Sequence, residues 1–119
     1  PTKTDQNWHI IIESLSSARA RGYTIKTAAI EKVHSFPAQG VRSVFTFGES
    51  FGKAQGILLA LKVPFQMVSP ARWMAEFSFP AGASKKDHAE VAKHLFPDMT
   101  VTQANADALL LAEYARRKL

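Results

Sequence analysis

Two short apolar segments, separated by a long helical segment, place the strongest limit on how this chain can fold. Residues 24–33 are rich in β-branched side chains and residues 64–68 are almost continuously apolar, so both are predicted to be strands. Residues 41–61, which lie between them, predict a helix. Strand, long helix and strand in this order imply a right-handed parallel crossover. The predicted fold class is therefore α/β, with a short parallel sheet flanked by helices.

The remaining segments predict helices on both sides of this crossover. The first helix begins near Asp5, which can cap it, and ends at Gly22. After the second strand, Ser69 followed by Pro70 is typical of a helix start, and Ser84 begins a sequence that resembles a capping box. Further helices are predicted at residues 71–77, 84–96 and 103–117, and a loop at residues 35–40.

Length and composition bound the architecture. At 119 residues, with 46% hydrophobic and 21% charged residues, the chain is predicted to be one domain with a single core. Two strands alone make a poor sheet, so we expect that a partner supplies the rest or that the N-terminal portion of a larger fold is absent. There is no cysteine, no apolar run long enough to span a bilayer and no signal-peptide pattern. We therefore expect a cytoplasmic protein without disulfides or membrane contacts.

Two acidic residues stand in otherwise apolar surroundings. Glu31 interrupts the first predicted strand, and Asp107 lies near the start of the last predicted helix, in a run of alanine and leucine. A carboxylate in such a setting is costly to desolvate unless it is paired, hydrogen-bonded or bound to a metal. Both acids are therefore candidate catalytic and metal-binding residues. Alternatively, Glu31 pairs with a lysine or lies at an exposed edge, and Asp107 stabilises the helix dipole.

A surplus of positive charge favours a polyanionic partner. The formal net charge is +5 at pH 7. The candidate phosphate contacts are Lys32 and His34 at the strand end, Arg72, and Lys85 and Lys86 at a helix N-terminus. For Lys32 and His34 a solvated surface pair is the favoured alternative, whereas Lys85 and Lys86 could equally form a solvated helix cap.

The remaining aromatic and histidine residues are predicted to have structural roles. Trp73 is predicted to anchor the core, with base stacking as the alternative. His9, His88 and His94 lack the spacing of metal ligands, so all three are predicted to lie on the surface. No P-loop, nucleophile elbow or dinucleotide fingerprint is present, so no small-molecule cofactor is expected.

Three glycines, four residues apart, form a stripe along the predicted helix 41–61: Gly48, Gly52 and Gly56. Each glycine in a helix costs about 1 kcal/mol relative to alanine, so the stripe indicates a close backbone approach. Packing within the chain is favoured, and a homodimer contact is the functional alternative. The phenylalanines around the stripe are predicted to fill the core: Phe45, Phe47 and Phe51.

In order and spacing, these segments resemble the RuvC-like Holliday-junction resolvases of phages and prophages, which belong to the ribonuclease H-like superfamily. The resemblance runs from about Ala28 to Arg117. The segments that carry it are Ala29-Ile30-Glu31-Lys32-Val33-His34, Phe47-Gly48-Glu49-Ser50-Phe51-Gly52, Val68-Ser69-Pro70 with Trp73, Leu95-Phe96-Pro97, and the run from Ala106 to Arg117.

The resemblance implies a crossover junction endodeoxyribonuclease, which hydrolyses DNA phosphodiesters at four-way junctions during recombination and acts as a homodimer. It implies that Glu31 and Asp107 bind Mg²⁺, with Mn²⁺ as a substitute. The family opens with a meander of three strands whose first carries an aspartate, and we expect a partial ribonuclease H-like fold without this meander. The family's second helix acid is also missing, since Thr102, Gln103 and Ala104 precede Asp107.

The missing acids leave a second function open, because two-metal hydrolysis needs enough carboxylates to hold both ions. The alternative is a catalytically silent DNA-binding or dimerisation module derived from such a resolvase. If the site is intact, the carboxylates of Glu31 and Asp107 should lie within about 10 Å of each other, at the carboxyl end of the first strand.

Overall fold

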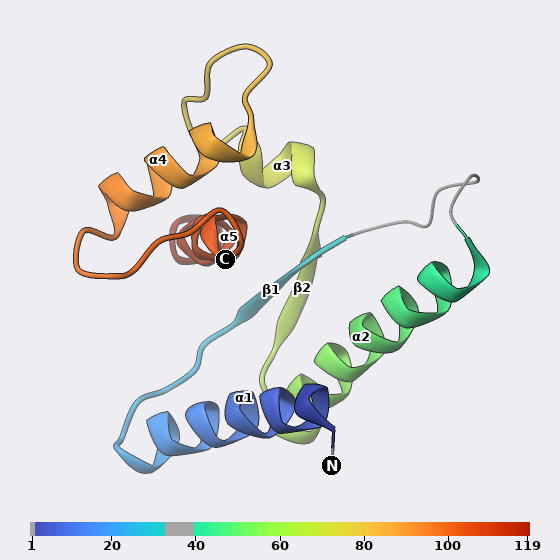
Figure 1. Cartoon of the computed structure of the whole chain (residues 1–119). Coiled ribbons are helices and arrows are strands. Elements are labelled where there is room, and N and C mark those ends of the chain that lie inside the picture. The colour runs from blue at the N-terminus through green and yellow to red at the C-terminus, as the bar shows by residue number, and fades with distance from the viewer. Residues whose placement is uncertain (1, 33–39) are drawn as a thin grey trace. The chain divides into compact units, whose positions relative to one another are not determined.

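The computed structural model describes residues 2–32 and 40–119 (Figure 1). The described residues form a mixed α/β structure with five helices and a sheet of two strands, as the sequence predicts. Their order along the chain is α1 (Lys3–Ala20), β1 (Ala28–Glu31), α2 (Val41–Ala60), β2 (Phe65–Val68), α3 (Pro70–Met74), α4 (Lys85–Leu95) and α5 (Ala106–Lys118).

The two strands pair in parallel, as predicted from their separation by a helix, and the right-handed sense of the crossover stays a prediction. The register runs from Ala28 opposite Phe65 to Glu31 opposite Val68, and the Lys32 amide adds one further bond of 2.7 Å to the Val68 carbonyl. The first strand is shorter than predicted: residues 24–27 have no regular structure, and residue 33 lies outside the described part. A strand extends only as far as its partner offers hydrogen bonds, and β2 offers four positions.

The chain packs as two compact units. Within the described residues, one unit comprises residues 2–26 and 40–64, and the other comprises residues 27–32 and 65–119. The first unit holds α1 and α2, and the second holds the sheet with α3, α4 and α5. The prediction of one nuclease domain over residues 1–119 stays a prediction.

In the first unit, α1 begins with a capping box one turn earlier than predicted. The Thr2 hydroxyl accepts a bond of 3.1 Å from the Asp5 amide, and the Asp5 carboxylate accepts one of 3.3 Å from the Thr2 amide. Thr2 rather than Asp5 is therefore the N-cap, and Asp5 supplies the reciprocal bond. At the other end, the Arg19 guanidinium donates to the Leu61 carbonyl just after α2.

The expected phenylalanine core around α2 is not formed. Phe45 is 72% exposed and Phe47 is 42% exposed, so the prediction that they are core residues is wrong. No described residue of α1 or α2 is buried. Two helices can cover only the stripe along which they meet, and in this unit there is no sheet to cover the remaining faces.

The second unit has a small core around α5. This helix packs against both α4 and β1, and Trp73 and Leu110 are completely buried within the cluster. The alanines at the helix contacts, among them Ala92 and Ala106, are also fully buried, and their small side chains let the backbones approach closely. The buried cluster consists of Val68, Trp73, Ala89, Ala92, Ala106, Leu110, Leu111 and Tyr114.

Local signals set the starts of the helices in this unit. Ser69 caps α3 with Pro70 at the first position, and Ser84 and Asp87 form a capping box at the start of α4, both as predicted. The last helix begins at Ala106 rather than at residue 103. Asn105 and Thr102 exchange hydrogen bonds of 2.8 and 3.2 Å between side chain and backbone, and this turn competes with a helical start at residue 103.

A glutamate that is almost completely buried binds the two arginines in the last turn of α5. Glu113 is 9% exposed and accepts bonds of 2.6 and 2.8 Å from Arg116 and of 2.9 Å from Arg117. The Arg116 hydrogen bonds make the largest contribution, and together with Arg117 they outweigh the opposing effect of desolvation. They lower the pKa of Glu113 from 4.5 to about 2. The carboxylate is therefore ionised in the folded protein at pH values where it is protonated in the unfolded chain.

We expect Glu113 to make the free energy of unfolding depend on pH in the acidic range. Its contribution is fully present above pH 4.5 and is lost as the pH falls towards 2, because the unfolded chain takes up the proton first. Urea unfolding at pH 6 and pH 3 should show a smaller loss of stability for Glu113→Gln than for the wild type. Glu90→Gln, at an exposed glutamate, is the control and should behave like the wild type.

Candidate metal and nucleic-acid site

Glu31 is the last residue of β1, at the carboxyl end of the parallel sheet. Its side chain is half-buried, and its Oε1 accepts a hydrogen bond of 3.3 Å from the indole Nε1 of Trp73. The donor is neutral, so the bond orients the carboxylate without neutralising its charge. The acid predicted from the interrupted strand is therefore present where open α/β sheets place their ligands.

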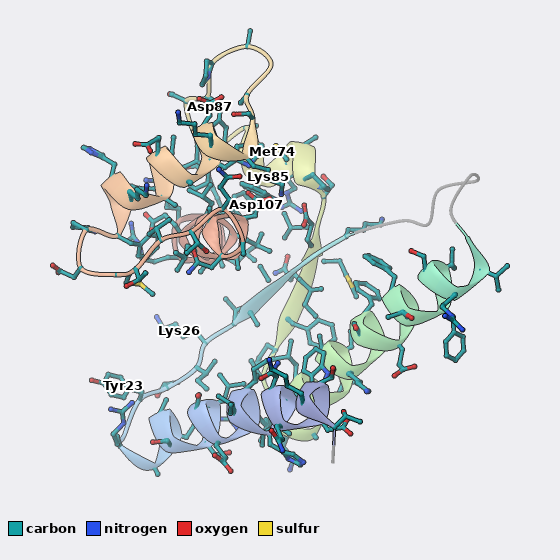
Figure 2. The ribbon with its side chains drawn as sticks, viewed as in Figure 1. Tyr23, Lys26, Met74, Lys85, Asp87 and Asp107 are labelled. Atoms are coloured by element: carbon teal, nitrogen blue, oxygen red, sulfur yellow. The ribbon has the colours of Figure 1, made fainter. Side chains whose placement is uncertain are left out.

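Asp107 lies in the first turn of α5 and binds two side chains of α4. Its Oδ2 accepts a bond of 2.6 Å from Lys85 Nζ, and its Oδ1 lies 2.7 Å from His88 Nδ1. Figure 2 shows Lys85 and Asp107 side by side between the two helices. Desolvation opposes ionisation, but the hydrogen bonds from Lys85 and His88 outweigh it and lower the pKa of Asp107 below its ordinary value.

His88 is not a surface residue, so this prediction is wrong. Its side chain is buried, and its ring centroid lies 4.6 Å from that of Phe79 and 5.9 Å from that of Trp73. The sequence spacing could have indicated that His88 is buried. His88 precedes the inward-facing Ala92 by four residues and so lies on the same face of the helix. His9 and His94 are exposed, as predicted.

Trp73 is a core residue, as the sequence predicts. It is fully buried, and its ring packs edge-on against Phe77 at 6.4 Å and against His88 at 5.9 Å between centroids. A side chain with no exposed surface cannot stack on a nucleobase, so the base-stacking alternative is excluded for this arrangement. Trp73 instead connects the strand that carries Glu31 to the helix that carries His88.

The candidate phosphate contacts differ in whether their charged groups already interact with other side chains of the protein. Lys32 and Lys86 are exposed, and Arg72 is exposed with its guanidinium 5.9 Å from the centre of the Tyr114 ring. Lys85 is bound to Asp107, although 64% of its side chain remains exposed. His34 lies outside the described residues. The four described cations belong to the same unit as Glu31 and Asp107.

Glu31 and Asp107 are connected through two buried rings. Trp73 binds Glu31, His88 binds Asp107, and the rings of Trp73 and His88 are in contact. The two acids therefore belong to one side-chain network that spans β1, α3, α4 and α5. The prediction that the carboxylates lie within about 10 Å stays a prediction.

The chemistry of these two acids fits magnesium, although they cannot form a complete cluster alone. In residues 2–32 and 40–119, no three histidine, cysteine, aspartate or glutamate side chains are grouped so that they could hold a metal ion. Magnesium is commonly bound by one or two carboxylates, with waters and substrate phosphates as its other ligands. An ion bound at Asp107 Oδ2 would have to replace the Lys85 ammonium there.

The glycine stripe of α2 shows no close packing against the described residues. A Cβ atom added at Gly48, Gly52 or Gly56 would meet no heavy atom within 4 Å, apart from the backbone of the helix itself. The close approach predicted within the chain is therefore not seen in this part of the structure. The alternative, a contact between two copies of the chain, stays a prediction.

Comparisons with known proteins do not identify a family. No model of a known protein family matches the chain, and no curated protein matches its sequence significantly. The resemblance to the RuvC-like resolvases therefore stays an interpretation of the sequence segments that carry it. In the part of the chain that the structure describes, no helix is long and apolar enough to cross a membrane.

Proposed function

We propose that the chain is a resolvase-type endonuclease domain, which hydrolyses DNA phosphodiesters at four-way junctions with Mg²⁺ or Mn²⁺. The observation that carries the proposal is the network in which Trp73 and His88 connect Glu31 to Asp107. In this proposal the sheet is part of a ribonuclease H-like fold, the protein acts as a homodimer, and its location is the cytoplasm of a bacterial or phage-infected cell.

The position of Glu31 supports a site at the end of the sheet. Ligands of open α/β sheets bind outside the carboxyl ends of the strands, and Glu31 ends β1. Asp107 begins α5, the helix that packs against β1. In this proposal, the acid that ends the strand and the acid that begins the helix packed against it share one ligand.

The residues around the acids have separate tasks in this proposal. Glu31 and Asp107 would hold magnesium, which would supply the Lewis-acid chemistry that activates a water and stabilises the leaving oxygen of the phosphodiester. Glu31 and Asp107 provide carboxylate oxygens. Lys85, once released from Asp107, provides a positive charge beside the site, because its side chain is long and largely exposed.

The surplus of positive charge supports a nucleic-acid substrate. The net charge is +5, and Lys32, Arg72 and Lys86 are exposed on the unit that holds the acids. Such charges attract DNA and release counterions on binding, independently of base sequence. A homodimer would present this unit twice, which suits a junction with symmetric strands.

A second candidate is the catalytically silent module that binds branched DNA or dimerises. One observation favours it: both oxygens of Asp107 are already bound, one to Lys85 and one to His88. In this alternative, the Lys85 ammonium stays bound to Asp107 as its counter-ion and is not replaced by a metal ion. The two candidates therefore differ in whether a divalent cation replaces the lysine.

Incubation of the protein with a labelled four-way junction and with a linear duplex of equal length tests the proposal. We expect paired nicks in the junction with Mg²⁺ or Mn²⁺ and none in their absence, and tighter binding of the junction than of the duplex. Preferential junction binding without cleavage under either metal would support the silent module. Equal affinity for both DNAs without cleavage contradicts both candidates.

We expect Lys86→Ala to weaken junction binding mainly through electrostatics. If Lys86 contacts one phosphate, its loss should reduce the slope of log affinity against log salt concentration by about one. Fluorescence anisotropy between 50 and 300 mM salt, roughly the range in which such slopes are measured, provides the test. Lys93→Ala is the matched control, since Lys93 is on the same helix and pairs with Glu90 at 3.5 Å. Equal slopes for both variants and the wild type would remove Lys86 from the interface.

A further inference from the structure

We propose that Trp73 and His88 are the positioning residues of the candidate metal site, with Trp73 orienting Glu31 and His88 orienting Asp107. This inference rests on the proposed function, since it assigns a task to two residues around the same two acids. Neither residue was expected to have this role from the sequence, where Trp73 is predicted to be a core anchor and His88 a surface residue.

Because Trp73 is buried, its indole N–H needs a hydrogen-bond acceptor within the protein. The side chain has no exposed surface, and a buried N–H without a partner costs free energy comparable to a lost hydrogen bond. Its acceptor is Glu31 Oε1 at 3.3 Å. Because the edge-on contact with Phe77 restrains the indole, the donor has a fixed direction. The carboxylate of Glu31 is therefore held by a group that cannot itself move away.

His88 holds Asp107 in the same way. The imidazole is buried, its ring packs against Phe79 at 4.6 Å between centroids, and its Nδ1 lies 2.7 Å from Asp107 Oδ1. The other oxygen of Asp107 is bound by Lys85, whose side chain is flexible and largely exposed. The histidine is thus the rigid support of Asp107, and the lysine is the partner that a cation can replace.

The contact between the two rings couples the acids. Trp73 and His88 meet edge to face, with 5.9 Å between centroids and an interplanar angle of 72°. A shift of either ring therefore disturbs the other acid as well as its own. Since Trp73 is fully buried and His88 nearly so, they act through Glu31 and Asp107 and do not themselves contact substrate.

Direct measurement of Mn²⁺ binding by electron paramagnetic resonance tests the inference without relying on cleavage. We expect Trp73→Phe, which keeps a ring but removes the donor, and His88→Leu to weaken Mn²⁺ binding by about 10–100-fold each. His88→Asn should restore most of the affinity, because its amide nitrogen can donate near the position of Nδ1. Trp8→Phe, on α1 in the other unit, is the matched control and should bind as the wild type does.

A spectroscopic measurement supplies a readout that packing alone would not change. In Trp8→Phe the only indole is that of Trp73, since the chain has two tryptophans. Its ¹H–¹⁵N indole resonance should shift during titration with Mg²⁺ and saturate with the Mg²⁺ affinity found by calorimetry. Adding Glu31→Gln should move the resonance before metal is present and remove the response to Mg²⁺. This measurement keeps Trp73 in place, so it is informative even if the Trp73 or His88 variants do not fold.

The outcomes separate this inference from the proposed function. If the wild type does not bind Mn²⁺, or binds it equally well after Glu31→Gln, the metal site itself is absent and both proposals fail. If Glu31→Gln abolishes Mn²⁺ binding while folded Trp73→Phe and His88→Leu bind as the wild type does, only the positioning role is overturned. An indole resonance that does not respond to Mg²⁺, in a protein that binds it, overturns the role of Trp73.

Discussion

Replacing Trp73 by alanine is expected to lower the free energy of unfolding by about 3–5 kcal/mol, the range found for large aromatic residues in protein cores. Trp73 is completely buried and belongs to the core cluster that includes Leu110 and Val68. Its removal leaves a cavity in the core cluster that β2, α4 and α5 build around it, and takes away the hydrogen-bond donor of Glu31. Trp73→Phe should lose less, because most of the ring volume remains.

Urea unfolding followed by far-ultraviolet circular dichroism measures this loss without depending on tryptophan fluorescence. Trp8→Ala is the control, because Trp8 is only half-buried and no residue of α1 is buried. We expect its effect to be clearly smaller than that of Trp73→Ala. Equal losses for the two variants would contradict the assignment of Trp73 to the centre of the core.

Replacing Glu31 by glutamine is expected to reduce junction cleavage by at least about 100-fold. The substitution keeps the shape of the side chain but removes the charge that would hold the cation in the proposed site. A catalytic metal stabilises the transition state by several kcal/mol, and about 1.4 kcal/mol corresponds to a factor of ten in rate. Single-turnover cleavage of a four-way junction in Mg²⁺ gives the rate, and junction binding in Ca²⁺ should change little.

Glu49→Gln is the matched control for this variant. Glu49 lies on α2 in the other unit and forms an exposed ion pair of 3.2 Å with Lys53, so its loss should leave the cleavage rate near that of the wild type. If Glu31→Gln cleaves as fast as Glu49→Gln does, Glu31 is not a ligand of the catalytic metal. Both variants are purified in parallel, so that a contaminating nuclease would contribute equally to both rates and a difference between them reports on Glu31.

The parts of the fold that depend on local signals were predictable from the sequence. Ser69 with Pro70, and Ser84 with Asp87, begin helices in the structure as they do in the prediction, because capping involves residues within one turn. The parallel pairing of the strands also follows from the sequence, since a long helix between two strands leaves few other arrangements.

The parts that depend on distant partners were not predictable. The length of β1 is set by β2, and the exposure of Phe45 and Phe47 depends on which elements cover α2. Apolar periodicity indicates which face of a helix is able to pack, but it does not reveal whether anything packs there. The sequence prediction therefore assigned a core to a helix on which no described residue is buried.

The residues of the candidate site also divide into those that could be predicted from the sequence and those that could not. Glu31 and Asp107 stand out in the sequence because each interrupts an apolar run. Their partners do not, because Trp73 is 42 positions from Glu31 and His88 is 19 positions from Asp107. An aromatic residue and a histidine on different helices carry no local mark of a shared hydrogen-bond network, and only the packing of α3, α4 and α5 brings them together.

The discontinuous make-up of the second unit sets the order in which its site can assemble. The helices α4 and α5 are neighbours in the sequence, whereas Ala28 can pair with Phe65 only after the chain has closed a loop through residues 40–64. Closing a long loop costs conformational entropy before any stabilising strand contacts have formed. Contacts between helices that are close in sequence therefore generally form earlier. We therefore expect the His88–Asp107 pair to form before Glu31 joins the network. In the proposed site, metal affinity would then report complete folding of the unit, because a partly folded chain would offer only one of the two carboxylates.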